Sequence, residues 1–176
     1  GQGAEVHVFE PNPHNLARLQ RNLALNGLEG RAVLNAVAVA DRVGEATFHL
    51  PLASNTGRGT LLADQADSAE TVTVPVTTLD AYFEALGRPP DLIKMDVEGV
   101  EWLVLRGAMN TLRAHRPVLF LEVVEESLRE MGATLADLAG LLRGLGYTVS
   151  RPNRQRLEEL PGELPPYDNL ICTPIH

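Results

Sequence analysis

The chain has 176 residues, enough for one ordinary domain, of which 44% are hydrophobic and 22% charged. This balance is typical of a soluble globular protein and excludes a disordered tail or a collagen-like fibre. The net charge is −8, and an acidic chain argues against nucleic-acid binding, which needs a basic face. No apolar run approaches the ~20 residues of a membrane span. The single cysteine, Cys172, cannot form an intrachain disulfide, which favours a reducing compartment such as the cytoplasm.

The first predicted elements are a strand at 6–9 and a helix that runs to residue 26. The apolar run at 6–9 ends at Glu10, as in a buried strand followed by an acid. Asn12 can cap the helix, and Pro13 suits its first turn. Three leucines then repeat at helical spacing, at Leu16, Leu19 and Leu23. The segment therefore predicts a strand, an acid, a turn and a helix.

The next segment predicts strands at 32–39, 46–50 and 72–76. Between the last two, residues 53–70 are polar and contain glycines and several acids. A loop of this length is longer than most connections and is typical of a lid or binding segment. We expect this loop to help select the substrate.

The second half of the chain alternates between predicted strands and helices. A short helix is expected up to Gly87, capped by Thr78 or Asp80. A helix capped by Thr134 is expected to end at Gly146, and residues 151–166 are expected to form a loop. The other expected elements are a helix at 100–112 and strands at 91–96, 117–124, 147–150 and 170–173.

This alternation predicts an α/β fold with a mainly parallel sheet and helices on both faces. Antiparallel pairs of 46–50 with 72–76 and of 147–150 with 170–173 would make the sheet mixed at its edges. No internal repeat or interdomain linker is visible, so residues 1–176 are expected to form one domain.

Acidic side chains follow three of the predicted strands. Glu10 follows the strand at 6–9, Asp96 and Glu98 follow the apolar run at 92–95, and Glu122 ends the apolar run at 118–121. Ligands of open α/β sheets bind beyond the carboxyl ends of the strands. Each acid alone could be a helix cap or a solvated strand end. Several acids in equivalent places instead indicate a ligand site, because converging carboxylates need a cation, donors or a bound ligand.

Two of these acids have a specific chemical interpretation. In nucleotide-binding folds, an acid at the end of the second strand accepts hydrogen bonds from ribose hydroxyls, and Glu10 could do so. Lys94 and Asp96 are two residues apart on one strand and therefore point to the same face. They form either a structural ion pair or a charge pair that orients Asp96 at the site. For Glu101, in the first turn of the following helix, the helix dipole is a sufficient explanation.

Several segments of the sequence together resemble the FkbM-type methyltransferase family, over about residues 5–173. These enzymes are class I, S-adenosylmethionine-dependent methyltransferases that mostly O-methylate small molecules or sugars. The segments that carry the resemblance are Phe9-Glu10-Pro11-Asn12-Pro13, Asn22 to Asn26-Gly27, Thr77-Thr78-Leu79-Asp80, Lys94-Met95-Asp96-Val97-Glu98-Gly99 with Glu101, Val104-Leu105-Arg106-Gly107-Ala108, and Leu121-Glu122.

The resemblance implies a Rossmann-like, seven-stranded sheet whose last strand is antiparallel. It implies S-adenosylmethionine as the cofactor, with its ribose at Glu10 and its adenine near Asn12, Asn35 and Ala36. Asp96 would lie beside the methionine moiety or the reacting centre. Glu98 and Glu122 would line the same pocket on the substrate side.

One departure from the family pattern concerns the start of the chain. Members of the family begin with a strand and a glycine-rich turn, and the ribose acid follows that turn by about 20 residues. Glu10 has only nine residues before it. We therefore expect an N-terminally truncated methyltransferase whose first strand is missing from the middle of the sheet, between 6–9 and 92–95. The unpaired edges would favour completion by another segment or association with another copy as a homo-oligomer.

The expected reaction is methyl transfer to a hydroxyl group of a small molecule. Asp96 or Glu122 would be the base, Lys94 would orient Asp96, and Glu98 would hold the acceptor. A divalent ion held by Asp96, Glu98 and Glu122 is an alternative that we do not adopt. Two other functions stay open: a non-catalytic binding or assembly module, which would not bind the cofactor, and another Rossmann-type enzyme, which would bind NAD or a nucleotide.

Overall fold

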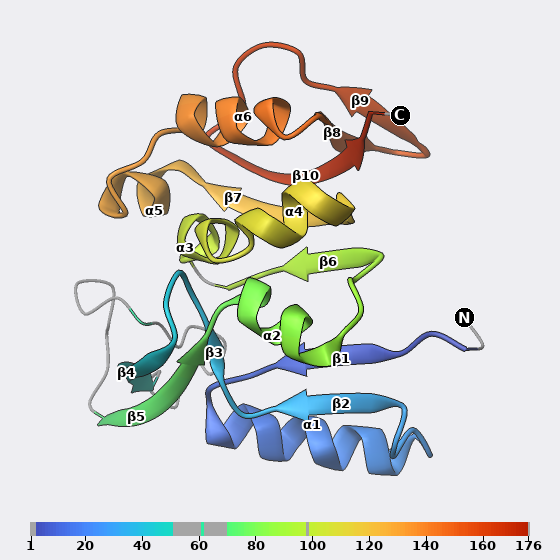
Figure 1. Ribbon diagram of the computed structural model, residues 1–176, viewed down its shortest axis with the longest axis vertical. Helices are drawn as coiled ribbons and strands as arrows, with labels where there is room; N and C mark the ends of the chain where they lie inside the picture. Colours follow the sequence, from blue (N-terminus) through green and yellow to red (C-terminus); the bar gives the residue numbers. More distant parts are fainter. Residues whose placement is uncertain (1–2, 51–60, 62–69, 98, 176) are drawn as a thin grey trace. The chain divides into compact units, whose positions relative to one another are not determined.

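The computed structural model describes residues 3–50, 61, 70–97 and 99–175 (Figure 1). Of the predicted loop at 53–70, only residues 61 and 70 are described. Glu98 lies outside the described residues. The chain divides into two units, Gly1–Thr77 and Thr78–His176. None of the helices that the structure describes is both long and apolar enough to cross a membrane.

The first unit begins with the predicted strand–helix–strand arrangement. Strand β1 (Val6–Phe9) pairs in parallel with β2 (Ala32–Asn35), and helix α1 (Pro13–Leu25) connects them. The helix starts as predicted: Asn12 is the N-cap, its side chain accepts a hydrogen bond from the His14 amide, and a proline occupies the first turn. The predicted leucine stripe of α1 is half-buried.

A second, three-stranded sheet completes the first unit. Its order is β3 (Ala38–Val39), β5 (Glu70–Thr77) and β4 (Gly44–Leu50), with β3 parallel and β4 antiparallel to β5. The expected antiparallel pair is therefore confirmed. The strand region expected at 32–39 contains two strands, β2 and β3, which belong to different sheets. The split follows Asn35, whose side chain bonds to strand carbonyls instead of packing as a strand residue would.

The second unit contains a five-stranded sheet in the order β6-β7-β10-β8-β9. Strands β6 and β7 are parallel, and β10 lies antiparallel between β7 and β8. The pairing of β10 with β8 confirms the antiparallel edge expected from the sequence. The strands are β6 (Leu92–Met95), β7 (Val118–Val124), β8 (Tyr147–Asn153), β9 (Arg156–Glu159) and β10 (Tyr167–Pro174).

One face of this sheet carries the buried core of the second unit. Strand register places alternate apolar residues on that face, and α4 and α6 lie over it in Figure 1. The helices are α2 (Leu79–Leu86), α3 (Glu101–Arg106), α4 (Met109–His115), α5 (Glu125–Glu130) and α6 (Leu135–Gly144). The buried apolar residues of the strands are Ile93, Met95, Leu119, Leu121, Val123, Tyr147, Val149, Leu170 and Cys172.

Two local predictions in the second unit are wrong. The single helix expected at 100–112 is two helices, α3 and α4, because the Asp80 carboxylate accepts hydrogen bonds from the Asn110 and Thr111 amides and so caps a new helix there. The loop expected at 151–166 contains the end of β8 and all of β9, which form a hairpin. The charged side chains of this segment obscure the alternation of apolar and polar residues that would indicate a strand. The Arg151–Glu158 ion pair joins the two strands.

The described residues do not form the single, mainly parallel sheet that the sequence predicts. The α/β class is confirmed, but the strands make three sheets of two, five and three strands. Three strand pairs are parallel (β1–β2, β3–β5, β6–β7), and four are antiparallel (β4–β5, β7–β10, β8–β10, β8–β9). The insertion of β10 and the additional strand β9 account for the larger antiparallel share. The last strand is antiparallel, as the resemblance implied.

Candidate functional site

The first candidate group lies at the carboxyl end of β1, where Glu10 follows the strand. The Glu10 amide donates to the Asn35 carbonyl at 3.0 Å and so extends the β1–β2 pairing by one residue. The Glu10 carboxylate accepts from the Asn12 amide at 2.8 Å and from the Asn15 Nδ2 at 3.4 Å. These bonds fix the orientation of the carboxylate. Since each carboxylate oxygen can accept a further hydrogen bond, Glu10 keeps two acceptor sites for a ligand.

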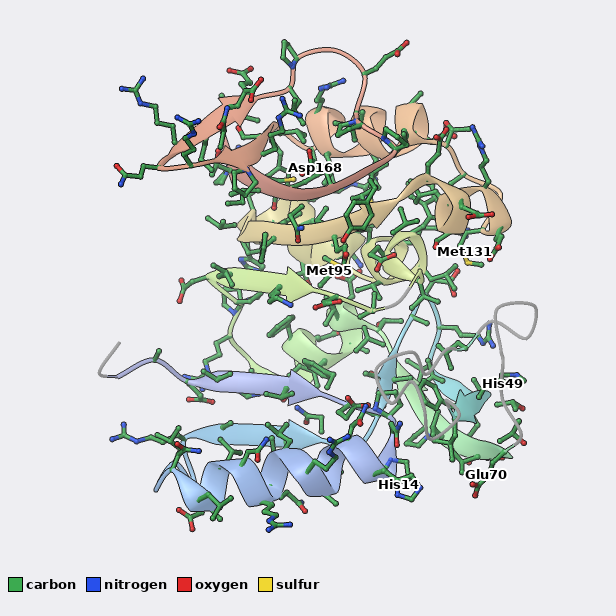
Figure 2. The ribbon with its side chains drawn as sticks, turned by 180° about the vertical axis from the view of Figure 1, so that it is seen from behind. His14, His49, Glu70, Met95, Met131 and Asp168 are labelled. Carbon is green, nitrogen blue, oxygen red and sulfur yellow. The ribbon has the colours of Figure 1, made fainter. Side chains whose placement is uncertain are left out.

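The two amide side chains predicted beside Glu10 are both used within the protein. Asn12 is buried, with 2% of its surface exposed, and its Oδ1 accepts from the His14 amide at 2.9 Å. Asn35 Nδ2 donates to the Val8 carbonyl at 3.0 Å, across the β1–β2 pair. The structure thus brings Asn12 and Asn35 to Glu10, where they support it. Ala36 follows β2 and is exposed. His14, at the start of α1, is also exposed (Figure 2).

The second candidate group lies at the carboxyl ends of β6 and β7 in the second unit. Lys94 Nζ donates to Asp96 Oδ2 at 2.8 Å, as the two-residue spacing predicted, and lies 5.9 Å from the centre of the Phe120 ring. Met95, which lies between Lys94 and Asp96 in the sequence and is labelled in Figure 2, points into the core instead. About half of each charged side chain is exposed. The pair therefore adds little to stability, and its hydrogen bond fixes the orientation of the Asp96 carboxylate.

The electrostatics of Asp96 favour its ionised form. The hydrogen bond from Lys94 is the main cause that lowers the pKa of Asp96, and partial burial opposes it. The Lys94 charge lowers the pKa further. Asp96 is therefore a carboxylate at neutral pH and can accept a proton or a hydrogen bond.

Glu122, in β7, has a partner that the sequence analysis missed. Tyr167, in the first position of β10, donates its hydroxyl to Glu122 Oε1 at 2.5 Å. This hydrogen bond, followed by the Glu122 charge, raises the pKa of Tyr167, and Asp96 and Asp168 contribute. Tyr167 thus stays protonated and holds one oxygen of Glu122. The contact depends on the pairing of β7 with β10, so no local sequence pattern could have indicated it.

Glu101 has a buried environment that the sequence analysis missed. It lies in the first turn of α3, as expected, but only 6% of its surface is exposed. One of its oxygens, Oε1, accepts from the Gly99 amide at 3.3 Å and from the Val97 amide at 3.4 Å. Burial is the main cause that raises the pKa of Glu101; the backbone hydrogen bonds oppose it, and the charge of Glu122 adds to it.

The second group therefore combines one cation, two partly exposed carboxylates and one buried carboxyl group. Asp96 and Glu122 offer oxygen atoms that can accept a hydroxyl hydrogen, which is the chemistry of a general base. Within the described part of the chain, no set of three or more His, Cys, Asp and Glu side chains is arranged to hold a metal ion. Glu98, a member of the triad considered for a cation, lies outside that part.

Two comparisons with known proteins found a match, one to a family model and one to a solved structure. The family model of the methyltransferase FkbM domain matches residues 1–149. The fold is similar to the crystal structure of methyltransferase FkbM from Methylobacillus flagellatus KT, with a TM-score of 0.58 and 18% sequence identity. That similarity covers 96% of this chain and 36% of the other, so the chain spans about a third of the length of this solved structure. None of the curated proteins matches the chain.

Proposed function

The chain belongs to the FkbM methyltransferase family, and we propose that it acts in S-adenosylmethionine-dependent O-methylation of a hydroxyl group on a small molecule or sugar. The observation that carries the proposal is the oriented Glu10 carboxylate at the end of β1, in a chain matched over most of its length by this family. A Rossmann-like arrangement of the whole domain is part of the same proposal.

The residues around Glu10 suit the ribose of the cofactor. A ribose presents two neighbouring hydroxyl donors, and the Glu10 carboxylate keeps two acceptor sites after its bonds to Asn12 and Asn15. Because the Asn12 and Asn35 side chains already bond within the protein, we assign them to support Glu10 and the adenine-side backbone. Exposed Ala36 would contact the adenine directly. Asp96 is our candidate for contact with the methionine moiety.

The second group would serve the methyl acceptor. When bound, S-adenosylmethionine supplies an electrophilic methyl group on a positively charged sulfur. Asp96 or Glu122 would accept the proton of the attacking hydroxyl, and Lys94 would hold Asp96 in its ionised form. The Tyr167 hydroxyl donates to Glu122 Oε1 and so holds this carboxylate in place. Glu98 would bind the acceptor as well.

Calorimetric titration with S-adenosylhomocysteine tests this proposal. We expect micromolar binding to the chain, weakened about tenfold or more in Glu10→Ala through the loss of hydrogen bonds to a charged group. Glu29→Ala is the matched control, because Glu29 is an exposed acid of the same unit. A folded chain that does not bind, or one whose Glu10→Ala variant binds like wild type, would contradict the proposal and favour a non-catalytic module.

A further inference from the structure

The turn between β6 and α3 is held by a buried side chain that the proposed reaction does not use. This turn starts at Asp96 and includes Val97 and Gly99, which has a φ of +97°. A backbone angle of this kind is accessible to glycine and strained for other residues. The N-cap of α3, Val100, has no side chain that could satisfy the free amides around it.

Glu101 supplies that missing acceptor from inside the helix. Its Oε1 bridges the amides of Val97 and Gly99, at 3.4 and 3.3 Å. These distances are long, as expected when a single oxygen serves two donors. A surface glutamate that merely favours the helix dipole would not be 94% buried or bonded backwards to the turn.

The buried position of Glu101 also has an electrostatic cost. Glu122, on the neighbouring strand β7, adds a like charge that raises the pKa of Glu101, and the backbone amides of Glu101, Gly99 and Val97 oppose this rise. A group retained under this cost is expected to serve something that an apolar residue could not. Here it fixes the Val97 and Gly99 amides of the turn that carries Asp96.

We propose that Glu101 is a positioning residue of the candidate site: by bridging the Val97 and Gly99 amides it fixes the turn after β6 and thereby holds Asp96 against Lys94. The functional meaning of this role rests on the proposed function, in which Asp96 is a site residue. The role itself is a property of the second unit and does not require the cofactor.

The test compares Glu101→Ala, which removes the acceptor, with Glu101→Gln, which keeps one side-chain oxygen and removes the charge. Glu126→Ala is the control, because Glu126 is an exposed acid in the first turn of α5, a helix of the same length as α3. The measurements are amide hydrogen exchange at Val97 and Gly99 and the pKa of Asp96 by carboxyl-carbon NMR. If Glu101→Ala does not fold, Glu101→Asp, whose shorter side chain also withdraws the acceptor, takes its place in the test.

We expect exchange at Val97 and Gly99 to rise about tenfold in Glu101→Ala. We also expect the pKa of Asp96 to rise, because the carboxylate would no longer be held at Lys94. Glu101→Gln should restore both values, and Glu126→Ala should change neither. Unchanged exchange or an unchanged pKa of Asp96 in Glu101→Ala would overturn the inference, and so would a failure of Glu101→Gln to rescue. A chain that shows the expected pattern and still does not bind S-adenosylhomocysteine would contradict the proposed function alone.

Discussion

Asp80 caps a helix to which it does not belong, and its removal should destabilise the second unit. Its side chain lies in α2, yet it accepts hydrogen bonds from the Asn110 amide at 3.0 Å and the Thr111 amide at 2.7 Å. These are the second and third residues of α4, whose own N-cap, Ala108, offers no side-chain acceptor. The Asp80 amide also donates to the Gly107 carbonyl at 2.9 Å. Asp80 therefore does the work of an N-cap for α4 from 30 residues away.

The expected magnitude follows from the bonds that are lost. Removing an N-cap acceptor costs about 0.5–2 kcal/mol, and the charge at the helix N-terminus adds ~0.3–1 kcal/mol. Because Thr111 is buried, the loss of the Asp80 oxygen would leave its amide without this hydrogen bond in the protein interior. We expect Asp80→Ala to lower the free energy of unfolding by about 2 kcal/mol. Asp80→Asn keeps one of the two oxygens and should cost about half as much.

Urea unfolding followed by the fluorescence of Trp102 would measure this effect. Trp102 is the only tryptophan of the chain and lies in α3, next to the capped helix. Glu84→Ala, at an exposed acid of the same helix α2, is the control and should stay within about 0.5 kcal/mol of wild type. An Asp80→Ala variant as stable as the Glu84→Ala control would refute the reasoning that this carboxylate creates the second helix.

Three further predictions concern the second unit. The raised pKa of Glu101 lets the folded state bind more protons than the unfolded state between about pH 4.5 and the pKa of the folded state, so stability should fall as the pH rises through this range. In urea unfolding at several pH values, Glu101→Gln should therefore show a flatter dependence of stability on pH. An equally steep dependence would exclude Glu101 as the cause. Lys94→Met should raise the pKa of Asp96 toward 3.8 in carboxyl-carbon NMR, since the main cause of its lowering is lost; an unchanged value would contradict the ion pair. Tyr147→Phe should cost about 1–2 kcal/mol in urea unfolding, because the buried Tyr147 hydroxyl donates to the Pro117 carbonyl at 2.9 Å; a variant as stable as wild type would show that this bond is dispensable.

The sequence predicted those elements whose signals are local. The strand at 6–9, the Asn12 cap of α1 and the Thr134 cap of α6 depend on residues within a few positions of one another, and the structure has all three. The break between α3 and α4 depends on Asp80, which is distant in sequence, and 100–112 therefore seemed to be one helix. Strand β9 was missed because its residues are mostly charged and exposed, which hides any alternation.

The same distinction applies to the candidate site. Glu10 and Asp96 follow strands that apolar runs define, and the Lys94–Asp96 pair follows from strand geometry, so the sequence indicated these groups. Tyr167 meets Glu122 only through the pairing of β7 with β10. The burial of Glu101 depends on packing around the turn, which periodicity does not reveal. Roles in cofactor and acceptor binding stay predictions for all of them.

The position of β10 in its sheet has a consequence for how the second unit is made. Strand β10 is translated after β7 and β8 but lies between them, antiparallel to both. The β8–β9 hairpin therefore has no partner in the sheet until residues 167–174 have left the ribosome. Until then, β7 exposes an unpaired edge of mostly apolar residues, which is a surface prone to aggregation. We expect nascent chains stalled before residue 167 to be held by chaperones or degraded, and released chains that include residues 167–174 to resist proteolysis.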